Sequence, residues 1–189
     1  MLTQIVTSND IIFKKFIPLM PIKKKRELNC TFTYTQPSGG DNMLRDDVRK
    51  YTEFELQYEA QRELYHYCCA QAILYGANDY YSIGLDPKTM RLIIPFGAGM
   101  CTGNTCGMLT GGVAAIGALF AEEMPTQNLK LKEVTRYWTE QFQREFQDLN
   151  CNNIKEINLK PDERCANLIL KAADILEEVI EKYKADITM

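Results

Sequence analysis

Apolar side chains recur at helical spacing along most of the chain after Met43, and this spacing predicts a series of helices. The first is expected from about Arg45 to Gly76, with an apolar stripe of Tyr51, Phe54, Tyr58, Tyr65, Cys69, Ala72, Ile73 and Gly76. These positions lie mostly three, four or seven residues apart, which places them on one helix face. A short second helix is expected to begin with Asp86 as its N-cap and Pro87 in its first position, and to end near Pro95.

Three further helices are predicted in the second half of the chain. A glycine-rich loop, residues 97–103, precedes a helix that is expected to start at Asn104 or Thr105 and to end near Ala121. The next helix covers about residues 129–149, with a stripe of Leu131, Val134, Trp138, Phe142, Phe146 and Leu149. The last is expected to start at Pro161 with Asp162 and Glu163 in its first turn, where acids complement the helix dipole. Its apolar face consists of Cys165, Leu168, Ile169, Ala172, Leu176, Val179, Ile180 and Tyr183.

No segment alternates with period two for long, so the pattern predicts an all-α fold. We expect a single bundle of about five helices, with the glycine-rich loop leading into a buried central helix.

Residues 1–42 differ in character from the rest of the chain. They contain three prolines and the basic run 23–26, and no helical period in them exceeds two turns. We expect residues 1–42 to form a poorly ordered N-terminal extension and residues 43–189 to form one helical domain.

The composition is that of an ordinary globular protein, with 46% hydrophobic and 25% charged residues and a net charge of −3. A negative chain without a basic face is a poor match for nucleic acid. The seven cysteines are odd in number and lack regular short spacing, and the N-terminus does not resemble a signal peptide. We therefore expect a cytoplasmic protein whose cysteines are ligands or redox thiols.

The stretch from Leu92 to Ala121 contains no charged residue. Pro95 and seven glycines interrupt it, and its most apolar part, from Cys106 to Ala121, is shorter than the about 20 residues of a membrane helix. A buried central helix explains this stretch better than a membrane span.

Four cysteines on separate predicted elements, Cys69, Cys106, Cys151 and Cys165, are the main candidates for chemistry. Cys106 and Cys165 are expected in the first turns of their helices, where the positive helix end lowers a thiol pKa and stabilises a thiolate. Cys151 is expected in a loop, and Cys69 on the first apolar stripe. Free cysteines are also among the most buried residue types, so a purely structural role remains open.

Gly107 and Gly111 lie four residues apart on one face of the predicted central helix. They would let another backbone, or a bulky inorganic group, come close, although tight helix packing alone would also explain them.

Other chemistries find little support. His66 is the only histidine, and a solvated or core role fits it better than a catalytic one. The chain has no Cys-x-x-Cys-His motif, so haem is not expected, and no phosphate-binding glycine loop. Cys101 and Cys106 are spaced as one half of a structural zinc site, but no matching second pair exists.

Several segments resemble the family of redox-active proteins named for its pattern, C_GCAxxG_C_C. The segment from Cys69 to Ile73 resembles its first cysteine motif, whereas Phe96–Met100 and Thr105–Gly111 resemble its central glycine-rich one. Cys151 and Cys165 resemble the third and fourth cysteines, the latter with the helix segment 172–176. The resemblance covers about residues 56–180, and Met108 departs from it where the family has Ala.

The resemblance implies a helical domain that binds a redox group through Cys69, Cys106, Cys151 and Cys165, with Gly107 and Gly111 beside it. Our leading hypothesis is electron transfer through an iron–sulfur cluster on these four cysteines, next to a redox partner protein or oxidoreductase. The chain is also compatible with a homo-oligomer. One alternative is a thiol–disulfide oxidoreductase in which Cys106 attacks and a second cysteine resolves. Another is a helical interaction module without chemistry.

Overall fold

The computed structural model describes residues 42–58, 65–122, 128–161 and 163–184, which belong to one compact unit of the chain, Tyr34–Met189. Within these ranges the fold is all-α, as predicted, with seven α-helices and no strand longer than an isolated bridge. The helices are α1 (Leu44–Thr52), α2 (Cys69–Tyr80), α3 (Pro87–Met90), α4 (Gly107–Phe120), α5 (Leu129–Phe146), α6 (Cys151–Asn158) and α7 (Ala166–Lys184).

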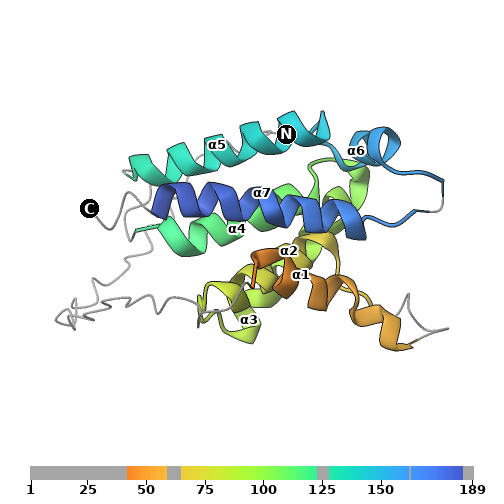
Figure 1. Ribbon diagram of the computed structural model, residues 1–189, viewed down its shortest axis with the longest axis horizontal. Coiled ribbons are helices and arrows are strands. Elements are labelled where there is room, and N and C mark those ends of the chain that lie inside the picture. The colour runs from red at the N-terminus through yellow and green to blue at the C-terminus, as the bar shows by residue number, and fades with distance from the viewer. Residues whose placement is uncertain (1–41, 59–64, 123–127, 162, 185–189) are drawn as a thin grey trace, which may run out of the picture. The chain divides into compact units, whose positions relative to one another are not determined.

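Helix α4 is the buried central helix, and it packs against α2, α5 and α7 (Figure 1). Met108, Ala115 and Ile116 on α4 are almost completely buried. Trp138 of α5 lies against Gly112, and its indole N–H donates to the carbonyl of Leu109 at 3.1 Å. None of the helices in the described part of the chain has both the length and the apolar character that crossing a membrane requires.

The predicted helix from Arg45 to Gly76 is wrong, because the chain folds back on itself in this region. Helix α1 ends at Thr52, and α2 begins only at Cys69. A Cβ on Gly76 would lie 2.8 Å from the Cα of Val48, so the two helices touch. One straight helix of this length would hold these two residues about 40 Å apart at about 1.5 Å per residue. Folding back buries the apolar stripes of α1 and α2 against each other.

The short helix α3 confirms the capping prediction, since the carboxylate of Asp86 accepts hydrogen bonds from the backbone of Lys88 and Thr89. A 3-10 helix, Arg91–Phe96, continues it up to the glycine-rich loop.

The ends of the later helices differ from the prediction. Helix α5 ends at Phe146, where Gln147 turns left-handed with a φ of 64°, and α6 was not expected at all. Asp148 explains the break, because its carboxylate accepts from the backbone of Leu149 and Asn150, both at 2.7 Å. Helix α7 begins at Ala166 and not at Pro161, so Glu163 lies before the helix. Asp162 lies outside the described residues.

The prediction of a poorly ordered segment over residues 1–42 falls almost wholly outside the described residues, and so does Cys30. These expectations therefore stay predictions.

Candidate four-cysteine site

Four helices meet with their N-terminal ends around one cavity of about 210 Å³. The cavity lies between α2, α4, α6 and α7, and five cysteines line its wall: Cys68, Cys69, Cys106, Cys151 and Cys165. The four cysteines singled out from the sequence are all among them, although they are spread over nearly a hundred residues of the chain.

Each of these four cysteines stands at the start of a helix. Cys69 is the first residue of α2, Cys106 is the N-cap of α4, and Cys151 is the first residue of α6. Cys165 directly precedes α7, and its carbonyl accepts the backbone N–H of Ile169 at 2.9 Å. Helix starts carry unpaired N–H groups and partial positive charge. The fold therefore directs four positive helix ends at one cavity.

Backbone hydrogen bonds hold Cys106 next to Cys151. The N–H of Cys106 donates to the carbonyl of Leu149 at 2.8 Å, and the N–H of Cys151 donates to the carbonyl of Asn104 at 2.6 Å. This pairing also explains why α4 starts at Gly107 and not at Asn104 or Thr105, since the residues before it are extended and bonded to the α6 start.

The two glycines predicted to lie beside the cofactor contact α2 and do not line the cavity. A Cβ on Gly107 would collide with the sulfur of Cys69, and a Cβ on Gly111 would lie 2.7 Å from the carbonyl oxygen of Ala70. Both residues face α2, which is the shared face expected from their spacing. Their small size lets α2 and α4 approach closely, and Gly107 also leaves room for the sulfur of Cys69.

Cys68 lines the cavity together with Cys69, although it is not among the four cysteines singled out from the sequence. On one continuous helix the two adjacent side chains would diverge by about 100°. Cys68 is instead the extended N-cap of α2, with φ of −71° and ψ of 162°, so helical spacing does not separate the two thiols. Cys101 is exposed and does not line the cavity.

Burial raises the pKa of several of the cavity thiols. It raises the pKa of Cys106 to about 12, and it also raises the pKa of Cys151 and of Cys165. The ammonium of Lys155 opposes this rise for Cys151 and Cys165. The expectation that a helix start lowers the pKa of Cys106 is therefore wrong, because desolvation outweighs it. Near neutral pH these cysteines are protonated thiols unless a bound cation displaces their protons.

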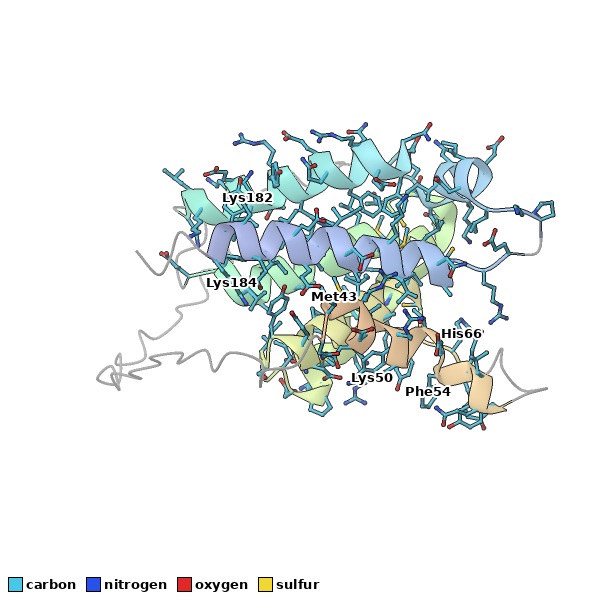
Figure 2. All side chains as sticks on the ribbon, in the orientation of Figure 1. Met43, Lys50, Phe54, His66, Lys182 and Lys184 are labelled. Atoms are coloured by element: carbon cyan, nitrogen blue, oxygen red, sulfur yellow. The ribbon has the colours of Figure 1, made fainter. Side chains whose placement is uncertain are left out.

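Charged side chains surround the same cavity. Lys155 lies one helical turn after Cys151 on α6, and Arg164 forms an ion pair with the buried carboxylate of Glu55. His66 is exposed and lines the cavity as well, at the end of the molecule where α7 begins (Figure 2). No short motif marks Lys155, Arg164 or Glu55, so sequence reasoning missed them.

Within residues 42–58, 65–122, 128–161 and 163–184, no three or more His, Cys, Asp or Glu side chains are arranged so that they could hold a metal ion. The assignment of the four cysteines as metal ligands therefore remains a prediction.

The family model described as "Putative redox-active protein (C_GCAxxG_C_C)" matches residues 67–179, well over half of the chain. This protein belongs to that family. The match to the C_GCAxxG_C_C family includes all four of the cysteines at the helix starts. Searches of curated proteins and of solved structures found no match.

Proposed function

We propose that this C_GCAxxG_C_C protein transfers electrons through an iron–sulfur cluster held by Cys69, Cys106, Cys151 and Cys165. The observation that carries the proposal is the convergence of these cysteines, each at a helix start, on one cavity. We further propose that its electrons pass to or from a redox partner protein or oxidoreductase.

The cavity suits a group larger than one ion. Two thiolates on a single tetrahedral ion lie about 3.8 Å apart when the metal–sulfur bonds are about 2.3 Å long. A cluster separates its ligands more widely, and a cavity of about 210 Å³ leaves room for several atoms. Four sulfur ligands also match the softness of iron–sulfur clusters.

The surroundings favour an anionic group. When bound, a cluster would accept and release single electrons. The four helix starts would face its negative charge with positive partial charge. Lys155 adds a full positive charge at the same wall.

Anaerobic reconstitution of the full chain with ferrous iron and sulfide tests the proposal. We expect about two or four irons and equal sulfide per chain, with visible absorption that bleaches on reduction. Cys165→Ser should lower the iron content severalfold, because a cluster lacking one of four thiolates is weakly held. Cys101→Ser is the matched control, since Cys101 is a cysteine outside the cavity, and it should bind iron like the parent.

The alternatives give different outcomes in the same experiment. A colourless protein that forms a disulfide between Cys106 and another cavity cysteine would support thiol–disulfide exchange instead. A colourless protein with inert thiols would indicate a helical interaction module. Equal iron loss in Cys101→Ser and Cys165→Ser would contradict the ligand assignment.

A further inference from the structure

Cys165 differs from the other three cysteines of the site in how its backbone is held. Cys69 and Cys151 are the first residues of helices. The N–H of Cys106 is bonded to the chain just before α6. Cys165 instead follows two residues without helical structure, 163–164, and stands before α7 begins. The position of this cysteine therefore depends more on the side-chain contacts of its neighbours.

Arg164, the residue directly before Cys165, contacts a distant part of the chain. Its Nη1 donates to Oε1 of Glu55, and the two side chains form an ion pair across 109 positions of the sequence. Glu55 lies in a short 3-10 segment, residues 54–58, that follows α1. Both side chains line the four-cysteine cavity. The ion pair thus ties the chain before α7 to the chain after α1 at the wall of the site.

The carboxylate of this ion pair is largely removed from water. The side chain of Glu55 is 12% exposed, whereas that of Arg164 is 53% exposed. Ion pairs between two exposed side chains contribute little, but a desolvated charge left without its partner is costly. Glu55 therefore favours the one position of Arg164 that satisfies it, and this position restricts the neighbouring Cys165.

We propose that Glu55 is a positioning residue of the four-cysteine site, which acts through Arg164 to hold Cys165 at the cavity wall. Glu55 lies outside residues 67–179, the range that the family model matches. The segment after α1 thus supplies a part of the site that the matched range does not contain. The inference rests on the proposed function in taking Cys165 as a cluster ligand, but the position of its thiol can be measured without a cluster.

Alkylation of the folded protein tests the proposal. The full chain, reduced and treated with a chelator, is exposed to iodoacetamide, and the labelling of each cysteine is followed over time by mass spectrometry. Glu55→Gln and Arg164→Gln should each raise the labelling rate of Cys165 at least about threefold, because the loosened segment opens more often. The labelling rates of Cys106 and Cys151 should not change.

The two variants together separate position from charge. Loss of the negative Glu55 favours the thiolate of Cys165, whereas loss of the positive Arg164 disfavours it. A purely electrostatic role would therefore change the labelling rate in opposite directions, and this result would overturn the proposal. Faster labelling of all the cavity cysteines would also overturn it, because a general loss of stability exposes them together. If Glu55→Gln does not fold, Arg164→Gln keeps the test, since only a positioning role makes its Cys165 react faster.

Glu53→Gln is the matched control. Glu53 is 49% exposed, pairs with Arg49 and does not line the cavity, so Cys165 should be labelled as in the parent. After reconstitution, Glu55→Gln should lose iron to a chelator severalfold faster than the parent. If the parent binds no iron, the cluster is contradicted, while selective labelling of Cys165 still supports the positioning role. If the parent binds iron but neither variant changes the labelling of Cys165, the positioning role is overturned and the cluster stands.

Discussion

At the scale of single residues, glycine decides how closely α2 and α4 approach. Gly111 faces the backbone of Ala70, and a Cβ there would lie 2.7 Å from its carbonyl oxygen. Gly117 is on the same helix, but a Cβ there would meet no atom within 4 Å. Gly111 therefore allows the close approach of α2 and α4, whereas Gly117 faces open space.

Replacing Gly111 with Ala should lower the free energy of unfolding by about 1–3 kcal/mol, because the new methyl group overpacks the α2–α4 contact. Gly111→Leu should be more severe. Gly117→Ala should instead raise the free energy of unfolding by about 0.5–1 kcal/mol, since Ala is the better helix former. Urea unfolding followed by circular dichroism measures both. Equal effects of the two Ala substitutions would show that Gly111 is not at a tight contact.

At the scale of elements, the short turn between α5 and α6 places Cys151 at a helix start. The Asp148 carboxylate accepts two backbone N–H groups and the side-chain amide of Asn153 at 2.8 Å. These hydrogen bonds, from Asn150 first, lower the pKa of Asp148 below its usual 3.8. The carboxylate of Asp148 thus helps to hold Cys151 at the start of α6, where it lines the cavity.

Asp148→Asn should lower the melting temperature at neutral pH, because the amide is a weaker acceptor for these N–H groups. The pKa of Asp148 is lower in the folded protein than in the unfolded chain, where it is about 3.9. The hydrogen bonds of the ionised carboxylate therefore stabilise the fold above about pH 3.9, and this stabilisation is lost as the pH falls through the pKa of the folded state. The gap between parent and variant should therefore close below about pH 4. Melting curves from pH 3 to pH 7 measure it, and a gap that widens in acid would contradict this role.

Helix α6 also carries the charge that faces the cavity. Lys155 lies four residues after Cys151, on the same helix face, and acts on Cys151 and Cys165. If the proposed cluster is bound, Lys155 should stabilise its reduced, more negative state.

Lys155→Met should lower the reduction potential of the reconstituted protein by tens of millivolts. An exposed charge contributes up to about 1 kcal/mol, and a tenfold change in a one-electron equilibrium corresponds to about 59 mV. Lys160→Met is the matched control, because Lys160 is exposed and does not line the cavity. Redox titration measures both variants. An unchanged or raised potential in Lys155→Met would exclude this electrostatic role.

At the scale of the whole molecule, one compact unit contains every described part of the site. The residues that line the cavity all lie between Thr52 and Ile169. The side chain of Asn42 donates to the buried carboxylate of Asp47 at 3.0 Å, close to where the described residues begin.

Removing residues 1–41 while keeping Asn42 should therefore leave the melting temperature within about 2 °C of the parent and should not change iron binding. Thermal unfolding by calorimetry and an iron assay test this expectation. A large drop in melting temperature would show that the removed segment packs on the helical unit.

Local patterning determined much of this protein in advance. The period of apolar residues predicts an all-helical chain, the uncharged stretch predicts the buried helix α4, and Asp86 with Pro87 predicts the start of α3. The order of the cysteines, together with the glycine-rich motif, predicts the family. These features can be read locally because helix formation and capping depend on residues within a few positions of one another.

Only the tertiary structure decided where the chain turns back and what meets at the cavity. One long amphipathic helix and two packed helices share the same period, so the pattern could not reveal the break between Thr52 and Cys69. Cys151 at a helix start, Cys68 on the cavity wall and Lys155 facing the thiols all follow from contacts between distant segments. Local periodicity carries no information about such contacts, because they form only when separate apolar faces are buried against each other.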